Sequence, residues 1–124
     1  MTYQIIVLKR GDKKVIYTQM NRECINKNDN SVYLKVSITE PILLACINGS
    51  LFSEIDLSVQ RVIPTCELVL RKYIFYLVSN SFISYNGIRK IYLIEPAGLD
   101  LLEIIYEQAK RRIIDYVDLT IKIE

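Results

Sequence analysis

The sequence predicts an α+β fold, and three observations support that prediction. The dipeptide Asn86-Gly87 stands between two short segments rich in β-branched and aromatic residues, which is the strongest short-range signal of a β-hairpin. Apolar residues recur at helical spacing on both sides of this hairpin, over residues 64–79 and 96–112. Before residue 39 the apolar residues fall into short runs typical of strands. We therefore expect a sheet-forming N-terminal part, followed by a helical part that contains one hairpin.

The N-terminal part is expected to form a small antiparallel β-sheet. Residues 3–9, 15–18 and 32–38 are the predicted strands, because each is rich in residues that favour extended backbone and is bounded by polar segments. A turn at residues 10–13 joins the first two strands. The charged, Asn-rich segment 21–31 predicts an exposed loop.

Three helices are expected between this sheet and the hairpin. Thr39 is the predicted N-cap of the first helix, which covers residues 41–47 and ends at Asn48-Gly49. The second helix covers residues 53–59 and the third covers residues 64–79. The expected buried stripe of the third helix consists of Cys66, Leu70, Ile74 or Tyr73, and Leu77.

The hairpin is expected to pair residues 82–85 with residues 90–94. Asn86-Gly87 would occupy a two-residue type I′ turn, which requires positive φ at both central positions. Glu95-Pro96 then opens a fourth helix over residues 96–112, because proline is favoured at the first helical position. The expected buried stripe of this helix consists of Leu99, Leu102, Ile105 or Tyr106, and Ala109.

The composition argues against an enzyme and against a metal site. The chain has no histidine, so it lacks the commonest general base and the commonest metal ligand. Cys24, Cys46 and Cys66 are widely spaced and odd in number, which argues against a zinc site and a disulfide framework. Cys46 and Cys66 are expected to be buried. Glu103 and Glu107 are expected to form an exposed helix face rather than a catalytic pair. We therefore expect no catalytic residue, no metal and no cofactor.

Location and source are inferred from composition alone. No apolar run is long enough to cross a bilayer, and the first residues lack the pattern of a signal peptide, so we expect a cytoplasmic protein without a membrane partner. The Ile-rich, His-free composition fits a thermophilic archaeon or its virus. The net charge is only +2, so any nucleic-acid binding would depend on local basic patches.

The order of elements from residue 40 onward resembles a known family. Residues 41–49 are similar to a first helix that ends in glycine, and residues 51–55 to the opening of a second helix. Residues 70–77 have the apolar spacing of a recognition helix, and residues 92–98 are similar to the step from a wing to a last helix. Over residues 40–108 the chain resembles the winged helix-turn-helix transcription regulators, with spacing most similar to the HxlR-like and MarR-like groups.

The resemblance implies a winged helix-turn-helix domain preceded by a small N-terminal antiparallel β extension. It divides one predicted domain, residues 1–124, into the extension (1–39), the winged helix-turn-helix (40–112) and a C-terminal strand or tail (113–124). Alternation over residues 116–123 predicts that strand, which the sheet could recruit. The sequence departs from the family at Ser81, where glycine is usual before the wing. Regulators of this family act as homodimers on double-stranded DNA, so a homodimer is expected.

The resemblance also implies a set of DNA contacts on the recognition helix (about 64–79) and on the wing (82–94). Arg71 could hold a guanine by two hydrogen bonds, whereas Lys72 suits a phosphate. The alternatives are that these two cations form only a solvated helix face, and that the wing tip is polar only for solubility. The expected DNA-binding residues are Thr65, Glu67, Leu68, Arg71, Lys72, Asn86, Arg89 and Lys90.

A second function is open on the same fold. Leu68, Val69 and Phe75 are apolar on the helix face where polar, base-contacting residues are usual. An apolar outer face suits a protein partner better than a phosphate backbone. The alternative is therefore a non-enzymatic protein-binding module or inhibitor on a winged-helix scaffold, which a virus could encode to act on host machinery.

Overall fold

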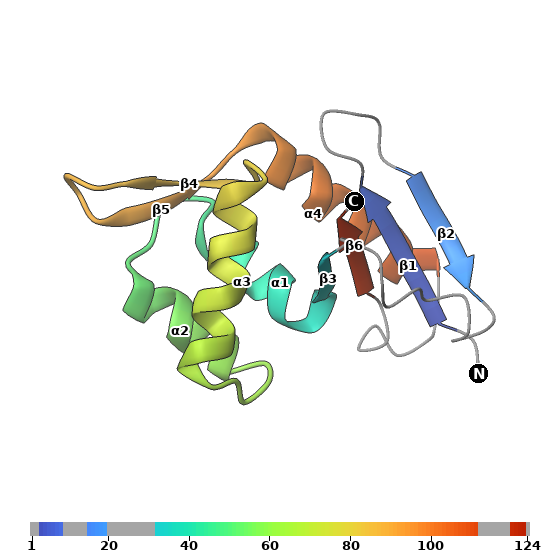
Figure 1. Cartoon of the computed structure of the whole chain (residues 1–124), viewed down its shortest axis with the longest axis horizontal. Helices are drawn as coiled ribbons and strands as arrows, with labels where there is room; N and C mark the ends of the chain where they lie inside the picture. Colours follow the sequence, from blue (N-terminus) through green and yellow to red (C-terminus); the bar gives the residue numbers. More distant parts are fainter. Residues whose placement is uncertain (1–2, 9–14, 20–31, 112–119, 124) are drawn as a thin grey trace. The chain divides into compact units, whose positions relative to one another are not determined.

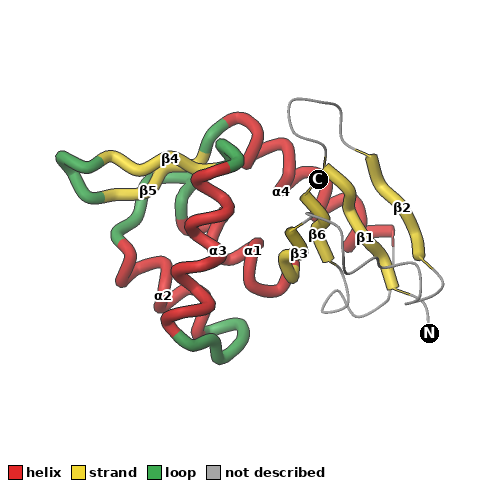
Figure 2. Tube along the Cα trace, viewed as in Figure 1, coloured by secondary structure: helices red, strands yellow, loops and turns green. Residues whose placement is uncertain are grey.

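The computed structural model describes residues 3–8, 15–19, 32–111 and 120–123 (Figure 1). The chain falls into two compact units, Met1–Val36 with Asp115–Glu124, and Ser37–Ile114. Strands and helices are both present (Figure 2), so the predicted α+β class is confirmed. The predicted turn at residues 10–13 and the predicted loop with its Cys24 lie outside the described residues.

The first unit is a four-stranded sheet in which the C-terminal strand is central. The strand order is β2-β1-β6-β3. β1 is antiparallel to β2 and parallel to β6, and β6 is antiparallel to β3. Leu34, Ile121 and Ile123 are buried in this sheet. The strands are β1 (Tyr3–Leu8), β2 (Val15–Gln19), β3 (Val32–Lys35) and β6 (Thr120–Ile123).

The expected small sheet is therefore present, but its strands are arranged differently. β6 lies between β1 and β3, so β3 does not neighbour the first two strands. The parallel pairing of β1 with β6 aligns Ile6 with Ile121. Strand periodicity specifies which side chains share a face, not which strand is the neighbour or in which direction it runs.

The second unit contains the four helices and the hairpin, which follows α3 (Figure 1). Its apolar core consists of buried side chains from every one of these helices and from the start of the hairpin: Ile42, Leu43, Cys46, Ile55, Val59, Leu70, Tyr73, Ile74, Leu77, Phe82, Ile83, Leu101 and Ile105. The elements are α1 (Val36–Ala45), α2 (Phe52–Gln60), α3 (Glu67–Ser79), β4 (Ile83–Asn86), β5 (Ile91–Ile94) and α4 (Pro96–Arg111).

The first helix begins earlier than predicted. α1 starts at Val36, so residues 36–38 are helical rather than extended, and Thr39 lies inside the helix instead of capping it. Val36 is fully buried and Ile38 and Thr39 are buried beside it. Their apolar alternation fits either a strand or a buried helical turn, and packing decides between the two. Pro41 is then inside α1, where it removes one backbone donor.

The third helix begins at Glu67, three residues later than predicted, and Cys66 is its N-cap residue. The turn before it is held by Gln60 at the end of α2. The Gln60 side-chain amide donates to the carbonyl of Thr65 and accepts the Thr65 backbone N–H at 3.1 Å. The predicted stripe is confirmed for Leu70, Tyr73, Ile74 and Leu77, but Cys66 is exposed, so its predicted burial is wrong.

The end of α3 is a Schellman motif with serine in the left-handed position. Ser81 has φ of 63° and its N–H donates to Val78 O at 3.1 Å. The N–H of Phe82 donates to Leu77 O at 2.9 Å. These two bonds satisfy helix carbonyls that would otherwise be unpaired. The chain is thereby turned from α3 into the hairpin.

The hairpin has a four-residue loop, not the predicted two-residue type I′ turn. Asn86 pairs with Ile91, which leaves residues 87–90 in the loop. Positive φ occurs at Lys90, at 58°, and not at Gly87. The side chain of Asn86 accepts the N–H groups of Ile88 at 3.0 Å and Arg89 at 3.1 Å. This side-chain capping favours the longer loop, because it supplies partners for loop amides.

The hairpin is anchored at its base on both sides. Ser50 and Tyr92 exchange two backbone hydrogen bonds of 2.8 and 3.0 Å, which ties β5 to the connection between α1 and α2. Gly49, with φ of +84°, precedes this bridge, and a Cβ there would lie 3.1 Å from Ile91 Cδ1. The bridge fixes β5 to the helical unit.

The last helix has a different buried stripe from the predicted one. Leu101, Ile105 and Gln108 are buried, whereas Leu99 and Tyr106 are about half exposed or more. The cause is the first turn of α4, where buried Gly98 packs against the start of the hairpin. Of the predicted stripe, Ile105 is confirmed and Leu102 is half-buried, while the side chain of Ala109 lies outside the description.

Candidate functional site

The outer face of α3 exposes most of the residues predicted to contact DNA. Leu68 is 80% exposed and Phe75, on the same face, is 64% exposed. Glu67, Arg71 and Lys72 are also exposed. Leu68 and Phe75 lie about two helical turns apart and are thus exposed on the same side of α3. We call these five residues, Glu67, Leu68, Arg71, Lys72 and Phe75, the outer face of α3.

Arg71 is held in place by two neighbours. Its Nε lies 3.3 Å from Glu67 Oε2, and its Cζ lies 4.2 Å from the centre of the Phe52 ring. The ion pair is exposed and contributes little to stability. Together with the cation–π contact, however, the ion pair orients the Arg71 guanidinium and holds it beside the start of α2.

Lys72 is held less closely than Arg71. Its Nζ is 6.0 Å from the Tyr76 ring centre, at the outer limit of a cation–π contact. A flexible ammonium group on an exposed helix face can reach a phosphate without fixed geometry. Lys72 therefore fits the predicted role of a positioning contact.

Thr65 belongs to the turn before α3 rather than to the exposed face. Its hydroxyl donates to Ile63 O at 3.0 Å, and its backbone groups bond to Gln60. The side chain is only half exposed. The structure thus gives Thr65 a role in holding the turn.

The hairpin tip exposes the other residues predicted to bind DNA, together with an apolar residue that was not among them. Asn86, Arg89 and Lys90 are exposed. The Oδ1 atom of Asn86 is engaged in capping the loop. Ile88, between them, is 95% exposed. An isoleucine among the polar residues of a hairpin loop could have indicated an exposed apolar side chain.

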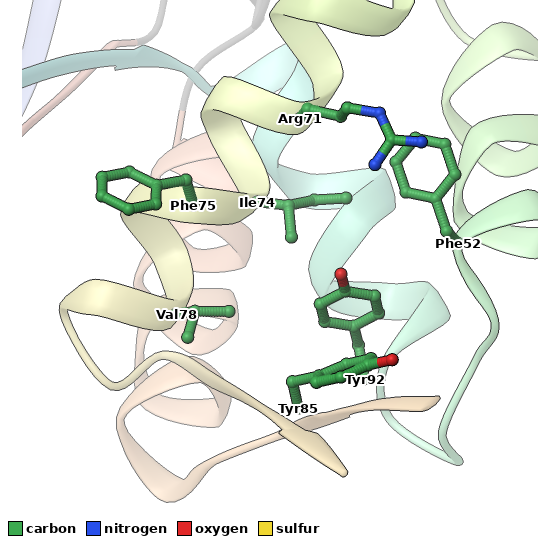
Figure 3. Close-up of a pocket in the computed structure, with 7 residues that line it drawn as sticks. All are labelled: Phe52, Arg71, Ile74, Phe75, Val78, Tyr85 and Tyr92. Carbon is green, nitrogen blue, oxygen red and sulfur yellow. The ribbon is translucent and has the colours of Figure 1, made fainter. Parts of the chain in front are cut away.

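A hollow of about 260 Å³ lies between α3, the hairpin and the start of α2 (Figure 3). Figure 3 shows Arg71 against Phe52 at one end and the two tyrosines of the hairpin at the other, with Ile74 between them; the Phe75 ring points away from the other rings. Sequence reasoning did not find this hollow. Its lining residues are Phe52, Arg71, Ile74, Phe75, Val78, Tyr85 and Tyr92.

The two tyrosines are cross-strand partners. Tyr85 on β4 is paired with Tyr92 on β5. Their ring centres are 4.7 Å apart and the ring planes meet at 45°. Residues directly opposite in a hairpin share a face. A sequence-based prediction could therefore have brought these two tyrosines together, but only with the correct loop length, because the loop length sets which residues are opposite.

Tyr92 keeps its proton well above neutral pH. Burial raises the pKa of its hydroxyl above the ordinary value of 10.0, and Tyr85 adds to that rise, while nearby Arg71 opposes it. The hydroxyl therefore remains a hydrogen-bond donor at physiological pH. In Figure 3 it points from the hairpin toward Ile74 and Arg71.

The sequence raised the question of a carboxylate pair on the last helix. Glu103 and Glu107 are exposed on α4, as expected. Within the described residues, no group of three or more Cys, Asp or Glu side chains could hold a metal ion. The described helices also include none with the length and apolar character that crossing a membrane requires.

Comparison with known proteins adds no relative. No family model matches the chain, and no curated protein is significantly similar to it.

Proposed function

We propose that the protein is a DNA-binding transcription regulator whose helical unit is a winged helix-turn-helix. In this proposal the helix-turn-helix consists of α2, α3 and the turn between them that Gln60 holds. The wing is the hairpin of β4 and β5. The order of helices and hairpin supports it. α3 enters the major groove, and the hairpin lies along the neighbouring backbone or minor groove. The protein acts as a homodimer on double-stranded DNA in the cytoplasm.

One observation carries the proposal, namely the charge on α3 and the hairpin. These elements contain four cations, Arg71, Lys72, Arg89 and Lys90, and one carboxylate, Glu67. All four cations are exposed. With a net charge of only +2 for the whole chain, this concentration of positive charge supplies the local patch that phosphate binding requires. In the proposed complex Lys72, Arg89 and Lys90 contact phosphates.

The proposal is tested by charge removal on this patch. Lys72→Ala and Arg89→Ala should each weaken duplex binding in fluorescence anisotropy and lower the slope of log affinity against log salt by about one. Lys35→Ala, on β3, is the matched control and should leave both quantities unchanged. Equal affinity and equal salt slope in all three variants and the wild type would refute the proposed interface.

A protein-binding module is the second candidate, and the apolar exposure favours it. Leu68, Phe75 and Ile88 are 80%, 64% and 95% exposed. A protein partner would bury these apolar side chains, which a phosphate backbone would not. Arg71→Ala and Leu68→Ala separate the two functions. Loss of ligand binding only in Arg71→Ala favours nucleic acid, and loss only in Leu68→Ala favours a protein partner, such as a host protein bound by a viral inhibitor.

A further inference from the structure

The hollow between α3 and the hairpin has the size of a site for one planar ring. Its volume is about 260 Å³, whereas pockets for drug-sized ligands span roughly 300–1,000 Å³. It is lined mainly by aromatic and aliphatic side chains and is open to solvent (Figure 3).

The walls of the hollow suit stacking. Tyr85 and Tyr92 form one wall, with ring centres 4.7 Å apart and ring planes inclined at 45°. At the other end Arg71 lies on Phe52, with 4.2 Å between its Cζ and the ring centre. Aromatic rings and guanidinium planes are the groups on which unpaired bases stack in nucleic-acid-binding proteins.

The polar groups at the hollow can recognise a base and its phosphate. The Tyr92 hydroxyl is directed into the hollow, where it can donate a hydrogen bond. Arg71 at the rim is paired with Glu67, with 3.3 Å between Nε and Oε2, and Lys72, which follows Arg71 on α3, adds a second positive charge beside the hollow. Positive charge next to stacking rings fits a base attached to a phosphate better than it fits an apolar side chain of a protein.

We propose that this hollow, lined by Phe52, Arg71, Tyr85 and Tyr92, binds an unpaired nucleobase of a nucleic-acid strand held on the α3–hairpin surface. The inference rests on the proposed function, because the strand is delivered by that surface. It adds a preference: the protein binds duplexes in which one base is out of the stack more tightly than fully paired duplexes. The cost of unstacking is smallest for a base that already has no partner.

The test compares three fluorescein-labelled duplexes of one sequence, by anisotropy. The first is fully paired, the second has one unpaired adenine, and the third has an abasic residue in place of that adenine. The abasic duplex controls for the flexibility of a bulge. The wild type should bind the adenine bulge about tenfold or more tighter than the other two, in keeping with the contribution of one stacked base.

Two tyrosine variants make the comparison specific. Tyr85→Leu removes a ring from the hollow at a half-exposed strand position and should abolish the gain of the adenine bulge over the paired and abasic duplexes measured with the same variant. Tyr106→Leu removes an exposed ring on α4 that does not line the hollow, and should keep the gain. With 2-aminopurine as the bulged base, stacking should lower its fluorescence in the wild type and in Tyr106→Leu only.

The outcomes separate this inference from the proposed function. Equal binding of all three duplexes overturns the base site and leaves the DNA-binding proposal intact. If no duplex binds but an adenine-rich single strand binds and depends on Tyr85, the base site stands and the duplex proposal fails. If neither duplex nor single strand binds, both are overturned. Equal gains in Tyr85→Leu and Tyr106→Leu also overturn the base site.

Discussion

Gly98 lies so close to Phe82 that a Cβ on Gly98 would be 2.3 Å from the Phe82 carbonyl oxygen. The same oxygen accepts the N–H of Glu95 at 2.9 Å. The first turn of α4 is therefore packed directly on the chain that leads from α3 into the hairpin. This contact fixes the base of the hairpin relative to α3 and α4, and thus positions one wall of the aromatic hollow.

Gly98→Ala should destabilise the protein by about 2 kcal/mol or more. Alanine gains up to about 1 kcal/mol of helix propensity over glycine, but the overlap with a backbone carbonyl forces α4 and the hairpin apart, at the cost typical of an overpacked core. Urea unfolding followed by circular dichroism measures the difference. Gly87→Ala is the control, because a Cβ there meets only Tyr85, at 3.8 Å, and stability should change little. Equal stability of Gly98→Ala and wild type would contradict the described packing.

Ser81→Gly should stabilise the protein by about 1 kcal/mol. Ser81 has φ of 63°, a conformation that costs an L-residue roughly 1–2 kcal/mol and costs glycine little. Ser79→Gly, the same substitution within α3, should instead destabilise by up to about 1 kcal/mol. Urea midpoints of the two variants should move in opposite directions. A loss of stability in Ser81→Gly would show that the Schellman motif is not formed as described.

Gln60→Ala should lower stability by about 1 kcal/mol. The variant removes both hydrogen bonds to Thr65 and the bond to Asp56, and exposed hydrogen bonds contribute at the low end of about 0.5–1.5 kcal/mol each. Gln60→Glu keeps an acceptor for the Thr65 N–H and should fall between alanine and wild type in thermal unfolding. If both variants unfold together with the wild type, the turn does not depend on Gln60.

The free energy of unfolding should fall at alkaline pH, because the Cys46 thiol ionises more readily in the unfolded chain than in the folded protein. Burial raises the pKa of this thiol from 9.0 to about 12, so the neutral thiol is favoured in the folded state. Stability from this group is complete below about pH 9, where the unfolded thiol is also neutral, and is lost as the pH rises toward 12. Each pKa unit is worth ~1.4 kcal/mol, so the full loss is roughly 4 kcal/mol.

Denaturant melts at pH 8 and pH 10.5 measure this loss, and Cys46→Ala should show a smaller drop between the two. Thiol labelling gives an independent check. In a Cys24→Ser background, exposed Cys66 should react at once with a thiol reagent, and buried Cys46 only as the protein unfolds. Immediate labelling of both thiols would contradict the burial of Cys46.

The parts of the fold that could be predicted are those specified by local patterns. The spacing of Leu70, Ile74 and Leu77 predicts α3, because a helix buries one stripe whatever its partner. Asn86-Gly87 predicts the hairpin, because an Asn-Gly pair with strand-forming residues on both sides is a strong local signal for one. The start of α1 could not be predicted, since Val36 and Ile38 suit a strand or a buried helix equally well.

The candidate site could be predicted only in part. Exposure of Arg71 and Lys72 follows from their position opposite the buried stripe of α3. The contact of Arg71 with Phe52 could not be predicted, because it joins two helices across a turn whose geometry depends on Gln60. The hollow beside Tyr92 depends on the register of a four-residue loop that side-chain bonds from Asn86 select, and the Asn-Gly pattern alone favours the wrong loop.

The central proposal, that the protein is a DNA-binding transcription regulator, is tested most directly by anisotropy titration of the purified protein with duplex DNA. The probe is the duplex that lies upstream of the protein's own gene, compared with a shuffled duplex of the same composition at two salt concentrations. The account predicts tighter binding of the native duplex and a steep loss of affinity for both duplexes at the higher salt. Absence of binding to either duplex at low salt would contradict it.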